Sequence, residues 1–275
     1  MKKIIIITVL GLILLGCKSY VHVLNTNSSL KTNNKRFYIY ENDTLKITYT
    51  FWQENGLMSF EIFNKSKVPI YVDWKKSSYI DNSVKLNYWV NEEKTKATSI
   101  YGSYYYDGPL LKPGHAVSAT AGVSYSTKVK PERITFIPPK SKYYRTQFYI
   151  LPNQHYKLST ETDFEKVPRN DKPKRKTKVY KAYYTRENSP LIFRNFLAYS
   201  MNEDFESVFF VDNEFYVSEI LEMDKRHFIQ KKWDEERNNR FYARDKNGDI
   251  IMYSVFEKPS SFYLKIPIES NINYR

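Results

Sequence analysis

Apolar and polar side chains alternate strictly along the first part of the chain. In the segment TLKITYTF, residues 44–51, every odd position is apolar and every even position is polar. A period of two is typical of a strand with one buried face and one exposed face. Asn55-Gly56 follows, a dipeptide that favours a tight hairpin turn, and the alternation resumes in MSFEI at 58–62. Residues 37–90 are therefore predicted to form an antiparallel meander.

Segments of strand length recur along the rest of the chain. They are short apolar runs at 134–137, 147–151, 190–199, 208–220 and 261–266. The fourth run is interpreted as one strand or as two strands joined at Asp212-Asn213. The highly charged segment Met223–Arg240 is the best helix candidate, and DKNGD at 245–249 predicts a second hairpin.

Many short strands without the spacing of βαβ units favour an all-β fold, an antiparallel β-sandwich. An immunoglobulin-like arrangement is possible, but only strand count and alternation support it. A chain with one cysteine cannot carry the Cys…Trp…Cys signature of that fold. The composition agrees, since 25 tyrosines and 17 phenylalanines suit pleated, half-buried surfaces. Only 8 glycines argue against a glycine-rich nucleotide loop. Residues 223–275 are expected to add a short helix and a hairpin to the sandwich.

The chain begins with the pattern of a secretory signal. Two lysines precede an apolar run, Ile4–Leu15. As a helix the run would be about 18 Å long, well short of a hydrocarbon core of about 30 Å, so a signal peptide is favoured over a membrane span. Leu14-Leu15-Gly16-Cys17 resembles the lipobox of bacterial lipoproteins, with Leu15 a slight departure. We expect a signal peptide at 1–16, cut between Gly16 and Cys17.

Lipid on Cys17 is expected to make the chain a membrane lipoprotein. A diacylglycerol thioether and a further acyl chain such as palmitate bind a bilayer durably, at about 0.8 kcal/mol for each buried CH₂. Lys18 stands where an Asp would resemble an inner-membrane retention signal, which favours the outer membrane, facing the periplasm. Polar residues 17–35 are interpreted as a flexible tether, and residues 36–275 as a single β-rich domain.

Positive charge is concentrated in one stretch. The net charge is +13, and the segment Lys166–Arg186 alone holds nine Lys or Arg residues and one acid. With two prolines it is interpreted as an exposed basic loop, and four of its cations are candidate contacts for an anionic surface: Lys172, Lys174, Arg175 and Lys176. A solvated charge run is the plainer alternative. Such local charge does not predict nucleic-acid binding.

No residue pattern predicts catalysis, a metal or a cofactor. The four histidines, at 22, 115, 155 and 227, lack the spacing of zinc ligands. Lipid on the one cysteine excludes thiol catalysis and internal disulfides. The DKNGD segment departs from a calcium loop, because its glycine falls at position four and position twelve is Phe256.

An aromatic loop is the other candidate site. Its members are Tyr101, Tyr104, Tyr105 and Tyr106, and Trp74 and Trp89 lie nearby in sequence. Aromatic faces bind sugars or peptides by stacking, although an edge strand of a tyrosine-rich protein has the same pattern.

Five segments resemble a group of uncharacterised bacterial lipoproteins with a β-rich body. They are ENDTLKITYTFW, FEIFNKSKVPIYVDWKKSSYI, ERITFIPPKS, SPLIFRNFLAYS and NEFYVSEI, and NKSKVPIYVDW is the most specific part. The resemblance runs discontinuously from Phe37 to Ile220 and implies a fold without catalytic residues. The first hypothesis is therefore a lipid-anchored, non-enzymatic structural or protein-interaction module of the cell envelope. The alternatives are a carbohydrate- or peptide-binding lipoprotein using Tyr101–Tyr106, with a glycan or envelope protein as partner, and an envelope hydrolase with dispersed residues.

Overall fold

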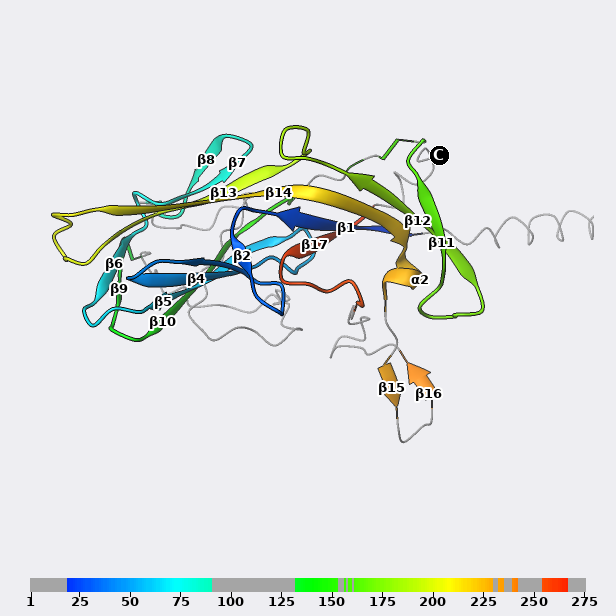
Figure 1. Cartoon of the computed structure of the whole chain (residues 1–275), viewed down its shortest axis with the longest axis horizontal. Coiled ribbons are helices and arrows are strands. Elements are labelled where there is room, and N and C mark those ends of the chain that lie inside the picture. The colour runs from blue at the N-terminus through cyan, green and yellow to red at the C-terminus, as the bar shows by residue number, and fades with distance from the viewer. Residues whose placement is uncertain are drawn as a thin grey trace, which may run out of the picture.

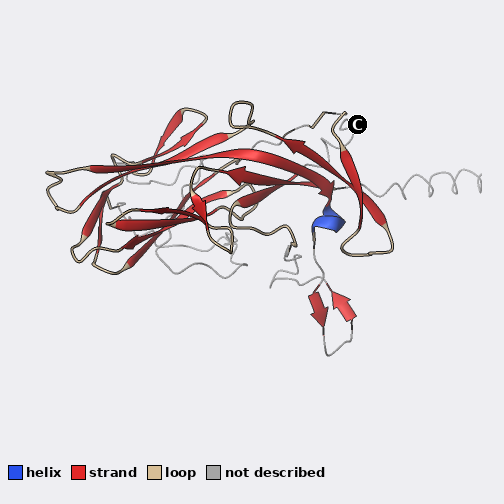
Figure 2. Cartoon of the chain, in the orientation of Figure 1, coloured by secondary structure: helices blue, strands red, loops and turns tan. Residues whose placement is uncertain are grey.

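The computed structural model describes residues 19–90, 132–152, 156, 158–159, 161–229, 232–234, 239–241 and 254–266. These residues form two antiparallel sheets that face each other, together with a small separate hairpin (Figures 1 and 2). The all-β, antiparallel prediction is confirmed, and the facing sheets have a sandwich-like arrangement.

The larger sheet has ten strands. Its main path is β11-β12-β14-β13-β6-β9. In addition, β1 pairs with β14 and β17 pairs with β1, while β7 pairs with β13 and β8 pairs with β7. The bounds are β11 Phe164–Pro168, β12 Lys176–Tyr183, β14 Phe209–Asp224, β13 Ile192–Ser200, β6 Ile70–Asp73, β9 Ile134–Ile137, β1 Tyr20–Asn27, β17 Ser261–Lys265, β7 Ser78–Asp81 and β8 Val84–Asn87. The 16-residue strand β14 is its longest member: its first half pairs with β13, and its second half lies between β1 and β12.

The smaller sheet has five strands in the order β10-β5-β4-β3-β2. The bounds are β10 Lys142–Tyr149, β5 Leu57–Asn64, β4 Leu45–Thr50, β3 Tyr38–Glu41 and β2 Lys31–Thr32. The turn before β5 is the predicted hairpin: Asn55 and Gly56 both have a φ of 64°, a left-handed conformation that Asn and Gly tolerate best.

An aromatic core joins the two sheets. The rings of Tyr49 and Phe51, from the smaller sheet, lie with centroids 5.0 Å from the ring of Phe215 in β14. Phe193 of β13 stacks on Phe215 at 5.3 Å. Offset and edge-to-face rings of this kind add about 0.5–1.5 kcal/mol for each pair beyond their area burial.

A second, smaller core lies on the other face of the larger sheet. It contains Val21 and Val23 of β1, Val179 of β12 and Met223 of β14, and Phe228 covers them. Phe228 belongs to α2, Lys225–Phe228, a helix of four residues that begins where β14 ends. Both faces of the sheet are therefore buried at this end of β14.

Within the described part of the chain, no helix is long and apolar enough to cross a membrane.

The prediction of a flexible tether at 17–35 is wrong for residues 20–27 and for the two residues of β2. Residues 20–27 form β1, a strand that lies between β14 and β17, with Val21, Val23 and Leu24 almost fully buried. Its side chains are buried on both faces of the sheet, so the strand lacks the alternation by which a half-exposed strand is recognised.

Three other segments differ from their predictions. The described residues of the predicted helix Met223–Arg240 form the end of β14, the short α2 and strands β15 (Lys232–Asp234) and β16 (Asn239–Phe241). The predicted basic loop Lys166–Arg186 is mostly the β11–β12 hairpin. The meander at 37–90 is divided, because β3, β4 and β5 belong to the smaller sheet and β6, β7 and β8 to the larger. The predicted hairpin turn at 245–249 lies outside the described residues.

Candidate functional site

Several predicted site residues lie outside the described part of the chain. These are Cys17 and the aromatic residues Tyr101, Tyr104, Tyr105 and Tyr106. The four candidate cations, Lys172, Lys174, Arg175 and Lys176, are described, and all of them are exposed. They stand at the tip of the β11–β12 hairpin and on the first residue of β12.

The first described residue, Ser19, lies at the same end of the molecule as this hairpin. The backbone N–H of Lys225 in α2 donates a 2.8 Å hydrogen bond to the carbonyl oxygen of Ser19. Figure 1 shows β11, β12 and α2 together at this end, with β1 running away from it. We call this region, made of Ser19, α2 and the β11–β12 hairpin, the basal end.

Hydrogen bonds attach the hairpin tip to α2, and an ion pair stabilises each of the two parts. The Arg169 guanidinium donates to both carboxylate oxygens of Asp171, at 2.5 Å and 2.9 Å. Asn170 donates through Nδ2 to the carbonyl oxygen of His227, at 2.6 Å, and through its N–H to Nδ1 of the same residue, at 3.3 Å. Asp224 caps α2 by accepting from the N–H of Arg226 at 2.8 Å, and it pairs with the Arg226 guanidinium. The tip is thus a fixed structure docked on a helix.

The electrostatics of this cluster favour a neutral histidine. Burial lowers the pKa of His227, and the carboxylates of Asp224 and Asp171 offset this only in part. Burial acts to raise the pKa of Asp224, but the hydrogen bonds from Arg226 outweigh it and hold the pKa below its ordinary value.

One face of the hairpin carries only cations among its charged residues. Cross-strand partners share a face, so Lys166 with Lys178 and Pro168 with Lys176 lie on the same side as Phe164 with Tyr180. The Lys178 ammonium lies 4.1 Å from the centroid of the exposed Phe164 ring. Val167 and Val179 point to the opposite face, into the smaller core.

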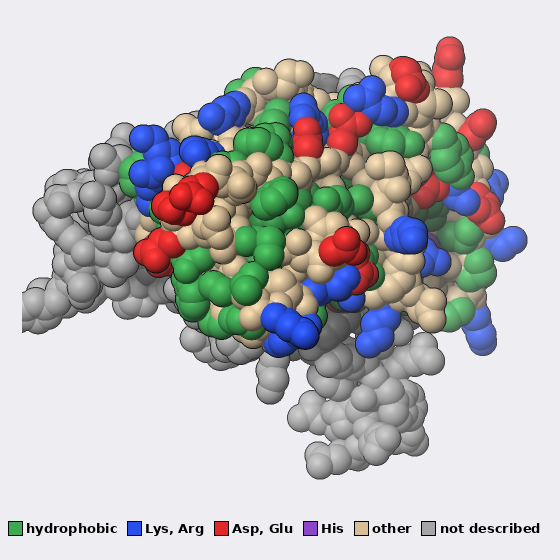
Figure 3. All heavy atoms as spheres, turned by 60° about the vertical axis from the view of Figure 1, so that its left-hand side comes forward, with side chains coloured by type: hydrophobic (Ala, Val, Ile, Leu, Met, Phe, Trp, Pro, Cys, Tyr) green, Lys and Arg blue, Asp and Glu red, His purple; other side chains and the backbone are tan. Residues whose placement is uncertain are grey.

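A second exposed feature lies on the outer face of the larger sheet. Phe196 of β13 stacks on Phe210 of β14 at 5.4 Å, and Tyr71 of β6 meets Phe136 of β9 edge-on at 5.5 Å. Phe210 is 58% exposed and Phe136 is 51% exposed. We call these four residues the aromatic strip. Figure 3, in which the end that carries β6 and β9 is turned forward, shows hydrophobic patches among charged side chains on this surface. Sequence reasoning missed the strip because its members come from four strands; Phe209-Phe210, where alternation fails, was its only local signal.

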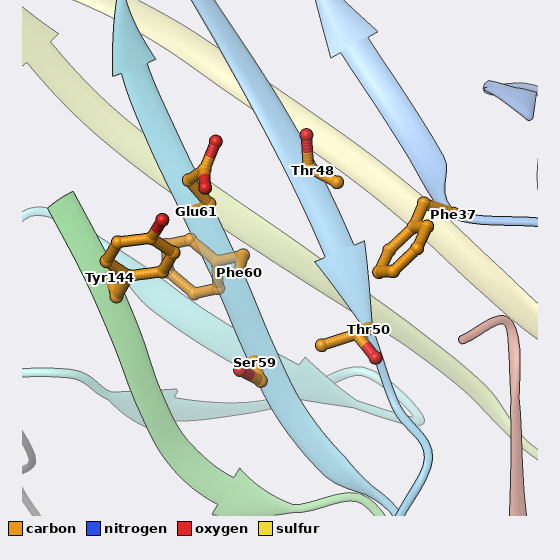
Figure 4. A pocket seen from close by; sticks show the side chains of 7 residues that line it. All are labelled: Phe37, Thr48, Thr50, Ser59, Phe60, Glu61 and Tyr144. Atoms are coloured by element: carbon orange, nitrogen blue, oxygen red, sulfur yellow. The ribbon is translucent and has the colours of Figure 1, made fainter. Parts of the chain in front are cut away.

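A shallow pocket lies on the outer face of the smaller sheet (Figure 4). Its lining residues are Phe37, Thr48, Thr50, Ser59, Phe60, Glu61 and Tyr144. The Glu61 carboxylate accepts from Lys142 at 3.1 Å, and a hydrogen bond to Glu61 raises the pKa of Tyr144. Hydroxyls and one paired carboxylate can hold a polar group but do not form a nucleophile-and-base pair.

Several polar groups that attract notice in the sequence are buried. His22 and Glu222 are cross-strand partners in β1 and β14, with Nε2 and Oε2 3.1 Å apart and both side chains closed to solvent. Trp74, which precedes the proposed aromatic loop in sequence, is fully buried, and the Arg145 guanidinium lies 3.8 Å from its ring centroid. Trp74 therefore cannot stack on a sugar at the surface.

Comparison with known proteins adds no assignment. Among the described residues, no group of three or more His, Cys, Asp or Glu side chains could hold a metal ion. No protein family, no curated protein and no solved structure matches the chain, so the resemblance to β-rich lipoproteins stays a prediction.

Proposed function

We propose that the chain is a lipid-anchored protein of the cell envelope, held in the outer membrane through Cys17, whose β-sandwich is a non-enzymatic interaction module. The observation that supports this proposal is the course of β14. Phe210, in the aromatic strip, stands near the start of this strand, and Asp224, the register partner of Tyr20, stands at its end. Fourteen steps of about 3.3 Å put these positions roughly 45 Å apart.

A module built in this way separates attachment from recognition. Lipid on Cys17 would hold the basal end at the bilayer, and the aromatic strip would lie on the far side of the domain. Exposed aromatic residues supply much of the binding energy in protein interfaces, because they bury a large area at low cost in conformational entropy. The proposed partner is another envelope protein.

The anchor is tested by Cys17→Ser. The expected result is loss of the protein from the detergent-phase membrane fraction, or retention as an uncut precursor. Unchanged mature size together with unchanged detergent partitioning contradicts the lipid anchor.

The recognition surface is tested by cross-linking in intact cells. A double variant, Phe136→Ser and Phe210→Ser, is expected to lose cross-linked partners. The matched control, Val84→Ser and Tyr183→Ser, removes two equally exposed apolar side chains elsewhere and is expected to keep them. Equal cross-linking by both variants contradicts the role of the strip.

Glycan or peptide binding through Tyr101–Tyr106 is the second candidate. The strip shows that the chain does expose rings to solvent, which is the chemistry this function needs. Replacing Tyr101, Tyr104, Tyr105 and Tyr106 with Ala, with the strip intact, is expected to abolish retention on peptidoglycan if this function holds. Retention that does not change with these residues rejects it.

A further inference from the structure

We propose that the β11–β12 hairpin binds the anionic headgroups of the membrane that holds Cys17. This inference rests on the proposed lipid anchor and adds a second membrane contact, which fixes how the domain stands on the bilayer. Its surface consists of the tip cations Lys172, Lys174, Arg175 and Lys176, with Lys166 and Lys178 on the adjoining face.

The register of β1, β14 and β12 places Ser19, the first described residue, beside the hairpin. Val21 of β1, Met223 of β14 and Val179 of β12 are register partners in one row across the sheet. Counting two residues outward brings Ser19 level with Thr177. Two strand spacings of about 4.8 Å separate β1 from β12, so Ser19 lies roughly 10 Å from Thr177 at the base of the hairpin.

The hairpin extends beyond the rest of the sheet. In the register of β12 with β14, Val179 pairs with Met223 and Lys178 is level with Asp224, the last residue of β14. The residues from Thr177 toward the tip therefore project past the end of β14. The pairing of β11 with β12 ends at Pro168 and Lys176, and turn hydrogen bonds close the tip beyond them. Arg175 stands two residues beyond Thr177, or roughly 7 Å farther out than the level of Ser19. Only residue 18 lies between Cys17 and Ser19, so a lipidated Cys17 is at most about 7 Å from Ser19. The tip and the anchor therefore reach about the same distance from the end of the sheet toward the bilayer.

The charge of the hairpin is not neutralised within it. Its two acids, Glu165 and Asp171, are paired with Lys181 and Arg169. The four tip cations are exposed and are carried on a backbone that Asn170 fastens to α2. Because the cations are already positioned, less conformational entropy is lost when they meet an anionic surface.

Position favours a bilayer over an acidic protein as the occupant. Because only two residue steps separate Ser19 from Cys17, the gap between the basal end and the membrane is less than about 10 Å, the spacing of two packed sheets. Anionic headgroups at that distance lie within roughly one Debye length, about 8–10 Å, of the cations. A folded protein partner does not fit into that space.

Vesicle co-sedimentation of the mature chain from residue 17, carrying Cys17→Ser and therefore no lipid, tests the inference. The vesicles are equal mixtures of phosphatidylglycerol and phosphatidylcholine, or phosphatidylcholine alone. The test variant replaces Lys172, Lys174, Arg175 and Lys176 with Gln. The control variant replaces four exposed lysines of the other end with Gln, Lys67, Lys75, Lys76 and Lys85, and so has the same net charge.

The expected result is binding to the anionic vesicles at low salt, weakened by added salt, and reduced about tenfold or more in the hairpin variant but little in the control. No binding to anionic vesicles at low salt, equal binding to neutral vesicles, or equal loss in both variants overturns the inference. Folding of each variant is checked by its thermal transition. Cys17→Ser fractionation decides the lipid anchor separately, so failure of the hairpin contact and failure of the anchor give different results.

Discussion

The phenol oxygen of Tyr49 lies 2.7 Å from the side-chain amide nitrogen of Asn213, and this hydrogen bond joins β4 of the smaller sheet to β14 of the larger. The side-chain amide nitrogen of Asn195 in β13 donates a second hydrogen bond to the same oxygen at 3.0 Å. The side-chain oxygen of Asn195, Oδ1, accepts from the Tyr88 hydroxyl at 2.7 Å. All four side chains are buried. Burial raises the pKa of Tyr49 far above its ordinary range, so the phenol stays neutral.

Tyr49→Phe is expected to destabilise the fold by about 1–3 kcal/mol. The ring still fits, but the amides of Asn195 and Asn213 lose their shared acceptor in a site that water does not reach. Urea unfolding measures the change. Tyr216→Phe is the control, because that hydroxyl accepts from Asn27 in an exposed pair, and it is expected to cost less than about 0.5 kcal/mol. Equal costs for the two variants would mean that the hydrogen bonds to the Tyr49 hydroxyl add no stability.

The hydrogen bond between Tyr49 and Asn213 also shows what the sequence alone could not predict. The sequence allows a junction between two strands at Asp212-Asn213, yet both residues lie within the continuous strand β14. A buried Asn is acceptable there only because a residue more than 160 positions earlier supplies its partner. Alternation predicted β4 and β5 well, since it reports a local property, one buried face. It could not identify β1, which is buried on both faces, or the aromatic strip, which four separate strands assemble.

Substitutions in β1 distinguish a core strand from a tether. Leu24→Ala is expected to cost about 2–5 kcal/mol, because Leu24 is fully buried in the main core. Asn33→Ala, at an exposed position in the same predicted tether, serves as the comparison and is expected to cost about 1 kcal/mol at most, through the loss of its turn hydrogen bonds. Thermal unfolding measures both. A harmless Leu24→Ala would restore the tether interpretation.

Gly56→Ala is expected to destabilise the fold by about 2–4 kcal/mol. The φ of 64° is unfavourable for alanine, and a Cβ would stand 2.8 Å from Cγ of the buried Phe262 and 3.0 Å from Cβ of Ile150. Asn55→Gly, at the preceding position with the same φ, relieves backbone strain and should be nearly neutral. Chemical denaturation compares the two variants, and a neutral Gly56→Ala would show that this turn is not packed as described.

Stability is expected to fall as the pH drops below about 6.5, partly through His227. Its pKa is lowered in the folded state, so the unfolded chain takes up a proton first as the pH falls through its ordinary value. The contribution is fully present above that value and is lost between it and the lowered native pKa. Because Asp224, Asp171 and Arg169 surround the ring, His227→Gln is the direct test, and it should flatten the decline. Parallel curves of unfolding free energy against pH for the two proteins would exclude His227 as a source.

The tip of the basic hairpin is expected to contain one structural ion pair and four cations that stability does not need. Arg169→Gln should cost about 1–3 kcal/mol, because the Arg169 and Asp171 side chains are only 9% and 5% exposed and the carboxylate would be left without its bidentate partner. The fourfold change of Lys172, Lys174, Arg175 and Lys176 to Gln should shift stability by less than about 0.5 kcal/mol, because these side chains are exposed. Thermal unfolding of the two variants measures the contrast. If the tip variant unfolds, its cations are paired inside the fold and cannot face a membrane. If Arg169→Gln is harmless, the Arg169–Asp171 pair does not fix the shape of the tip, and the contact of Asn170 with α2 is what holds the cations in place.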